Sequence, residues 1–191
     1  MKRNLSDFVI LNKNVISDEL CDLTVQELEA SSNWRQHVFN KFTDGKLTEI
    51  QSDHDPRQHD ADLPTVIPSL MEVYWKTIYK YISQDINYDW FTSWQGFDHL
   101  KFLQYAPNTE MRNHCDHIHS MFDGQKKGVP ILTVIGQLND GFTGGEFTMF
   151  DNEPIGLDKG DILIFPSSFM FPHTVQRITE GVRYSASTWV F

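Results

Sequence analysis

The second half of the sequence is a series of short runs rich in β-branched and aromatic residues, and this pattern limits the possible folds more than any other feature. The runs are HLKFLQY (99–105), PILTVIGQL (130–138), GEFTMF (145–150), DILIFP (161–166), HTVQRI (173–178) and VRYSASTWVF (182–191). Glycine, proline, asparagine and aspartate separate them, as expected for strands joined by turns. Serial short strands suit a barrel or jelly roll that closes its own sheet edges.

The first half has the spacing of helices. Ser17 is a suitable N-cap for a helix, and acidic residues follow it in the first turn. Apolar residues from Ile67 to Ile82 recur at helical spacing, and Pro68 is tolerated in a first turn. Between the two helices, residues 51–64 have the composition of a polar loop and are a candidate substrate lid.

Helices followed by serial strands predict an α+β protein that is mainly β, with a double-stranded β-helix (jelly-roll) core and supporting N-terminal helices. A chain of 191 residues suits one domain with a sizeable core. No repeat or flexible linker divides the chain. We therefore expect a single domain over residues 1–191, with helical support over about 1–87 and the jelly-roll core over about 88–191.

Composition excludes several classes of function. The net charge of −10 disfavours nucleic acid as a partner, because such binding needs a basic face. No run approaches the roughly 18 apolar residues of a membrane span, so no membrane partner is expected. Asp7 and Asn12 interrupt any signal-peptide core, and Cys21 and Cys115 are too few for a disulfide framework. We expect a cytoplasmic protein with reduced thiols.

The stretch RNHCDHIHS (112–120) is a candidate metal site. On a strand, residues two apart point to the same side, so His114 and Asp116 can bind one ion while Cys115 points away. Completed by a distant histidine, this pair is the ligand set of non-haem Fe(II) oxygenases. His117 and His119 compete as ligands, although the directions of side chains along the strand favour solvated positions for both in a turn after it. Zinc is an alternative, since it also accepts imidazole and carboxylate ligands.

A distant histidine and an arginine lie near the end of the chain. His173 begins a β-rich run, and Arg183 follows ten residues later, beyond an expected tight turn at Glu180 and Gly181. This turn returns the arginine to the same barrel mouth. There the guanidinium could bind a dicarboxylate through paired hydrogen bonds.

The segment from about Tyr105 to Trp189 resembles the Fe(II)- and 2-oxoglutarate-dependent dioxygenases, in particular the prolyl 4-hydroxylase-like branch. YAPNTEMRNHCD is similar to the branch's Tyr-x-Pro-Gly and His-x-Asp motifs, with Asn108 in place of the glycine. LTVIGQLNDGFTGGEFTMF resembles its Thr-x-x-x-x-Leu-Asn strand and Gly-Gly-Glu motif. LDKGDILIFP and PHTVQRITEGVRYSASTW resemble the Gly-Asp strand and the distal His, Gly-x-Arg and closing Trp. The motifs occur in family order.

The resemblance implies a role for each of eight residues. The implied Fe(II) ligands are His114, Asp116 and His173, with no catalytic residue beyond them. The implied contacts of 2-oxoglutarate are Arg183, which would bind its distal carboxylate, and Tyr105, Gln137 and Ser185. Trp189 is a candidate wall of the substrate pocket, with a core position as the alternative. The remaining cosubstrate is O2, and the resemblance also admits ascorbate as a reductant.

The implied reaction is hydroxylation of a substrate with release of succinate and CO2. Asp116 favours this outcome, because relatives that halogenate lack the carboxylate. The implied partner is a peptide or protein with a target proline. Acidic residues would favour basic groups beside that proline: Asp53, Asp55, Asp60 and Asp62.

Two departures from the family pattern concern binding rather than metal chemistry. Met111 replaces a cosubstrate-contacting tyrosine, and Pro130 replaces an arginine that often grips the peptide. The same chemistry on a free amino acid, another protein residue or a nucleobase is therefore an alternative. So is a non-catalytic metal-binding jelly-roll module.

Overall fold

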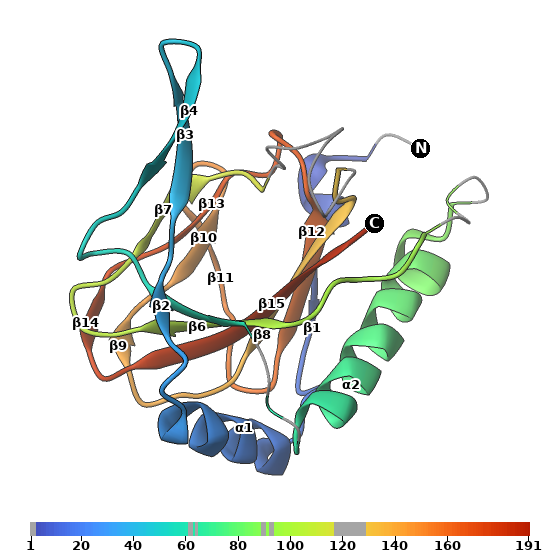
Figure 1. Ribbon diagram of the computed structural model, residues 1–191. Coiled ribbons are helices and arrows are strands. Elements are labelled where there is room, and N and C mark those ends of the chain that lie inside the picture. The colour runs from blue at the N-terminus through green and yellow to red at the C-terminus, as the bar shows by residue number, and fades with distance from the viewer. Residues whose placement is uncertain (1–2, 61–62, 64, 89–90, 92–93, 117–128) are drawn as a thin grey trace.

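The computed structural model describes all residues except 1–2, 61–62, 64, 89–90, 92–93 and 117–128 (Figure 1). The helical elements are η1 (Leu5–Phe8), α1 (Asp18–Ala30), α2 (Ile67–Lys80) and the π-helical turn η2 (Tyr81–Ile86). The strands before residue 88 are β1 (Ile10–Asn12), β2 (Arg35–Gln36), β3 (Phe39–Thr43), β4 (Lys46–Ile50) and β5 (Arg57–Asp60). The later strands are β6 (Lys101–Tyr105), β7 (Met111–His114), β8 (Leu132–Gln137), β9 (Thr143–Gly144), β10 (Phe147–Met149), β11 (Glu153–Ile155), β12 (Ile162–Pro166), β13 (His173–Val175), β14 (Ile178–Glu180) and β15 (Arg183–Val190).

Two antiparallel sheets form the body of the protein (Figure 1). The larger sheet has the strand order β1-β12-β8-β15-β6-β5-β2, and the smaller has the order β11-β10-β13-β7. Strands β9 and β14 form a separate pair, as do β3 and β4, which project from the barrel as a hairpin. The arrangement confirms the predicted mainly-β jelly roll.

Alternation along the strands divides the buried side chains between two cores. Val134 and Ala186 face outward from the larger sheet and pack with Tyr74 of α2. Phe165 and Phe147 belong to the inner core between the sheets. Because successive strand residues point to opposite faces, β1, β8 and β12 supply side chains to both cores. Because helices cover the outer face of the larger sheet, a functional site can form on its inner face, between the two sheets.

Both predicted helices are present, each with the expected start. The Ser17 hydroxyl accepts a hydrogen bond from the Leu20 amide at 3.2 Å and caps α1. Pro68 lies in the first turn of α2, where its missing amide hydrogen removes no helical hydrogen bond. Both α1 and α2 pack on the outer face of the larger sheet (Figure 1). The helical first half nevertheless also supplies strands, since β1, β2 and β5 all belong to that sheet.

The prediction of a polar loop over residues 51–64 is wrong for its central part. Residues 57–60 form β5, which pairs with β6. Asp55, predicted on an acidic surface, is instead only 2% exposed. Its carboxylate accepts hydrogen bonds from Arg112 Nη2 at 2.8 Å and from Arg112 Nε at 3.2 Å. The Gln36 amide also donates to the carbonyls of Ser52 and Asp55. These contacts hold residues 52–60 against the barrel, an arrangement unlike that of a freely moving lid.

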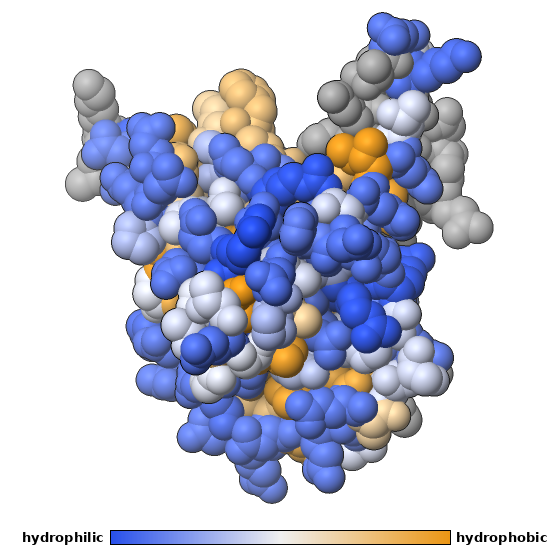
Figure 2. Space-filling model, turned by 90° about the vertical axis from the view of Figure 1, so that its left-hand side faces the viewer, coloured by the Kyte–Doolittle hydropathy of each residue, from blue (hydrophilic) through white to orange (hydrophobic). Residues whose placement is uncertain are grey.

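The outer surface is largely polar on the face shown in Figure 2, where apolar side chains form small, separate groups. Among the described residues, the most exposed large apolar side chain is Phe169, which is 84% exposed. None of the described helices has the length and apolarity required to cross a membrane.

Gly136 on β8 provides a test of the packing between α2 and the larger sheet. A Cβ atom at this position would overlap the Tyr74 hydroxyl, which is buried and donates to the carbonyl of Ala186 at 2.8 Å. We expect Gly136→Ala to lower the free energy of unfolding by about 1–3 kcal/mol, the usual cost of overpacking a core. Urea denaturation would measure the change. Gly156→Ala is the matched control, since a Cβ there meets no atom within 4 Å. Equal destabilisation by both substitutions would contradict this account.

Candidate metal centre

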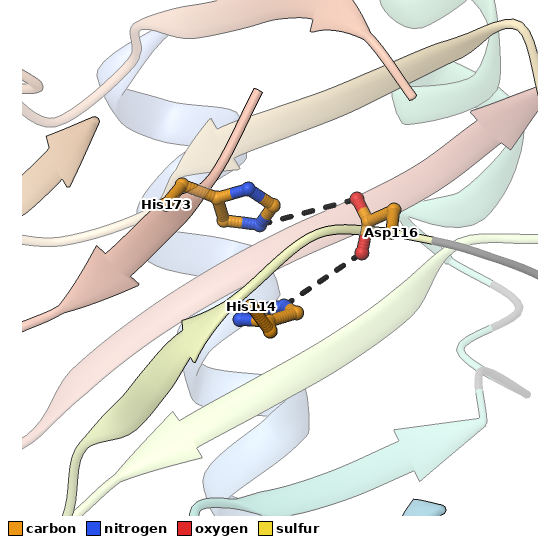
Figure 3. Close-up of side chains that lie close together, drawn as sticks. All are labelled: His114, Asp116 and His173. Atoms are coloured by element: carbon orange, nitrogen blue, oxygen red, sulfur yellow. Dashed lines mark ion pairs between the residues drawn. The ribbon is translucent and has the colours of Figure 1, made fainter. Parts of the chain in front are cut away.

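The three predicted metal ligands lie together between the two sheets. His114 at the end of β7 is paired with His173 at the start of β13, and Asp116 approaches both (Figure 3). The Nε2 atom of His114 is 3.7 Å from Asp116 Oδ1, and that of His173 is 3.9 Å from Oδ2. One donor atom from each residue lies within 4.8 Å of the other two. Three donors so close together can bind one cation.

Hydrogen bonds to the backbone orient both imidazoles for metal binding. His114 Nδ1 is 2.7 Å from the carbonyl oxygen of Arg112, and His173 Nδ1 is 3.1 Å from that of Phe171. A carbonyl can only accept, so each Nδ1 carries the hydrogen and donates it. Each Nε2 is then left with a lone pair, and both lone pairs are available near Asp116. Metal-bound histidines commonly have such a fixed tautomer.

The electrostatics of the site also suit a divalent cation. Burial lowers the pKa of His173 to about 4, although Asp116 partly offsets this effect. Burial alone would raise the pKa of Asp116, but His173, His114 and hydrogen bonds from Thr133 and Trp189 together bring it below its usual value. At neutral pH, His173 is therefore neutral and Asp116 is ionised. These are the protonation states that metal ligands require.

The local backbone differs from the expected continuous strand. Strand β7 ends at His114, so Asp116 lies just beyond it and reaches the site from a non-regular segment. Cys115 points elsewhere, as predicted, and its Sγ donates to the carbonyl of Phe169 at 3.3 Å. The competing ligands His117 and His119 lie outside the described residues.

Arg183 lies in the same barrel, at the first position of β15. It is 1% exposed, and none of its three guanidinium nitrogens has a hydrogen-bond partner within the described part of the chain. Its Cζ atom is 5.0 Å from the ring centroid of Tyr105. Burial lowers the pKa of Arg183, but an arginine stays protonated in proteins. A buried cation without a counterion is costly, so this position is suited to receive an anionic ligand.

The other predicted cosubstrate contacts surround Arg183. Tyr105 pairs with Arg183 across β6 and β15, and Ser185 pairs with Gln137 across β15 and β8. All are about 1% exposed, and burial raises the pKa of Tyr105 to about 12, so its hydroxyl remains a donor. The Gln137 Nε2 donates to the carbonyl of Asn139 at 2.8 Å, while its Oε1 has no partner among the described residues. The fold thus brings four predicted residues together on three neighbouring strands of the larger sheet, β8, β15 and β6.

Sequence reasoning missed several residues beside the metal centre. Phe39 of β3 approaches His114 edge-on, with ring centroids 5.9 Å apart. Lys101 Nζ lies 4.1 Å from the ring centroid of Trp189, which is half-buried and contacts Asp116. Alternation could have identified Lys101, since it lies four positions before Tyr105 on the same strand. No sequence signal identifies Phe39, because its approach depends on the β3–β4 hairpin.

Comparison with known protein families finds a match to the second half of the chain. Residues 100–191 match the 2OG-Fe(II) oxygenase superfamily. The matched segment contains all three candidate metal ligands as well as Arg183. No curated protein sequence matches the chain.

Solved structures of prolyl hydroxylases share the fold. A viral collagen prolyl hydroxylase from Paramecium bursaria Chlorella virus 1 has a TM-score of 0.64 at 16% identity, covering 96% of this chain and 94% of that one. A prolyl 4-hydroxylase from Pseudomonas putida has a TM-score of 0.67 at 16% identity, with coverage of 96% and 91%. A Trichoplax adhaerens prolyl hydroxylase in complex with a hypoxia-inducible-factor peptide fragment has a TM-score of 0.69 at 17% identity, with coverage of 97% and 84%. At these identities the similarity establishes the fold.

Proposed function

Because residues 100–191 belong to the 2OG-Fe(II) oxygenase superfamily, we propose that this dioxygenase hydroxylates a peptidyl proline, with His114, Asp116 and His173 as its iron ligands. The observation that supports this most is the position of the three donors in the same barrel as a buried arginine without a partner among the described residues. The first group suits a divalent cation, and the second suits the distal carboxylate of 2-oxoglutarate.

The donor set favours an open catalytic metal over a structural zinc ion. Structural zinc sites are usually closed by four protein ligands, mainly cysteine and histidine. The cluster found among the described residues has three donors, two imidazoles and one carboxylate. This is the facial set that leaves coordination positions for other ligands. When bound, Fe(II) and 2-oxoglutarate would use O2 to supply oxidative decarboxylation, with release of succinate and CO2 and transfer of one oxygen atom to the substrate.

The protein's own residues would bind and orient the reactants. Arg183 would hold the distal carboxylate of 2-oxoglutarate through its two-pronged guanidinium, with hydroxyl donors from Tyr105 and Ser185 beside it. Gln137 has an unpartnered side-chain oxygen on the same inner face. Trp189 is half-buried and contacts the metal-binding carboxylate, so it could line the substrate pocket beside the metal.

A peptide is the substrate class that the fold comparisons favour. The three solved structures are prolyl hydroxylases, and the Trichoplax adhaerens protein is bound to a peptide. The expected attraction of a basic peptide has weaker support. Asp55 forms an ion pair with Arg112, and Asp60 forms one with Arg35. Asp53 is exposed, and Asp62 lies outside the described residues. We therefore propose a proline-containing peptide without assigning its charge.

Mass spectrometry of reaction products tests both parts of the proposal. The protein would be incubated with Fe(II), 2-oxoglutarate and either proline-containing peptides or lysate proteins. We expect metal-dependent succinate formation and a mass gain of one oxygen localised to proline by fragmentation. Reactions without Fe(II) or without 2-oxoglutarate are the controls. Oxygen on another residue or on a free amino acid would refute the proline assignment. Absence of succinate with every substrate would instead favour a non-catalytic metal-binding module.

A further inference from the structure

We propose that Thr133 and Ser167 form a hydroxyl chain that positions the metal-binding carboxylate of Asp116. This inference depends on the proposed metal site. The Oγ1 atom of Thr133 donates to Asp116 Oδ2 at 2.6 Å, and the same Oγ1 lies 2.6 Å from the hydroxyl of Ser167. Thr133 is 2% exposed and Ser167 is 5% exposed, so water does not readily replace either contact.

The direction of the two hydrogen bonds follows from their chemistry. An ionised carboxylate can only accept, and Thr133 has a single hydroxyl hydrogen, which it donates to Asp116. Ser167 must therefore be the donor in its contact with Thr133. The chain runs from Ser167 through Thr133 to Asp116. Each hydroxyl that accepts one bond becomes a better donor in the next.

This chain links three separate parts of the barrel. Thr133 lies on β8, Ser167 follows the end of β12, and Asp116 follows the end of β7. Ser167 is itself fixed, because its amide donates to the carbonyl of Ile131 at 3.0 Å. Asp116 lacks the support of a regular strand, so hydrogen bonds from the Thr133 hydroxyl and from Trp189 fix the rotation of its carboxylate. The remaining lone pairs of Asp116 can then point toward the two imidazoles.

Three substitutions test the chain through metal binding. Thr133→Val keeps the shape of the side chain and removes the hydroxyl. We expect it to weaken Fe(II) binding by roughly 10- to 100-fold, the usual effect of removing a group that orients a ligand. Thr133→Ser keeps the hydroxyl and should restore affinity to near the wild-type value. Ser167→Ala should have a smaller effect than Thr133→Val, because Thr133 can still donate to Asp116. Anaerobic calorimetric titration with Fe(II) alone measures these affinities.

A matched control separates positioning from general stability. Thr188 is also buried on a strand of the larger sheet, but its hydroxyl donates to the carbonyl of Asp98 at 2.8 Å. Thr188→Val should lower thermal stability without changing Fe(II) affinity or the visible spectrum of bound Co(II). Thr133→Val should change both, and circular dichroism checks that each variant is folded.

The outcomes distinguish this inference from the proposed function. Fe(II) affinity of Thr133→Val within twofold of wild type would overturn the chain, as would failure of Thr133→Ser to restore affinity. Equal weakening by Thr188→Val would also overturn it, since the effect would then be one of general stability. Failure of the wild-type protein to bind Fe(II) would overturn the proposed metal site as well.

Discussion

Alanine at His114, Asp116 or His173 is expected to abolish 2-oxoglutarate turnover. Each substitution removes one of three converging donors, and the described part of the cluster contains no fourth donor to replace it. The loss should exceed the roughly 10- to 100-fold effect of removing a group that only orients a ligand. Succinate formation measures turnover, and metal content after dialysis against Fe(II) measures binding. Both should fall together, because the missing residue binds the metal directly.

Matched histidine substitutions test whether the assignment of ligands is correct. His54→Ala removes a described histidine whose Nδ1 contacts the carbonyl oxygen of Asn108 at 3.1 Å, outside the metal cluster. His117→Ala and His119→Ala remove the two competing residues of the sequence cluster. All three variants should retain most of the turnover. Loss of metal in the His117 or His119 variant, with retention in a variant of the proposed triad, would refute the assignment of the metal ligands to His114, Asp116 and His173.

The residues that the sequence predicts well are those whose placement depends on local periodicity. The two-residue repeat of a strand predicted that His114 and Asp116 face one ion while Cys115 points away. In the structure, donor atoms of His114 and Asp116 lie close together, and the Cys115 Sγ instead contacts the carbonyl of Phe169. Helical spacing identified α2, because one face of this helix packs on the larger sheet. In these cases a single physical rule acts within one short segment.

The residues that the sequence did not predict depend on contacts between distant segments. Thr133 and Ser167 are 34 positions apart and meet because β8 and β12 are neighbours in the larger sheet. Asp55 is polar and lies in a polar stretch, so its burial cannot be inferred without its partner Arg112, which is 57 positions away. Strand β5 was missed for a similar reason. Its residues Gln58 and His59 are buried polar groups, which give no apolar alternation.

Substitution of Arg183 should weaken the binding of 2-oxoglutarate and, in the absence of 2-oxoglutarate, make the protein more stable. Losing a charge-assisted pair in a site shielded from water costs about 2–5 kcal/mol, so Arg183→Met should raise the Michaelis constant for 2-oxoglutarate by roughly 30- to 4,000-fold. Arg183→Lys keeps the charge but loses the two-pronged geometry, and it should fall between wild type and Arg183→Met.

The same Arg183→Met variant should unfold at a higher urea concentration than wild type when 2-oxoglutarate is absent. The wild-type guanidinium is buried and has no hydrogen-bond partner among the described residues, and replacing such a charge by an apolar side chain of similar length removes a desolvation cost. Added 2-oxoglutarate with Mn(II) should stabilise the wild type more than the variant, because ligand binding adds stability only where affinity is retained. If Arg183 has only a structural role, the Arg183→Met variant should be less stable than wild type and its Michaelis constant for 2-oxoglutarate should be unchanged. That result would remove Arg183 from the site.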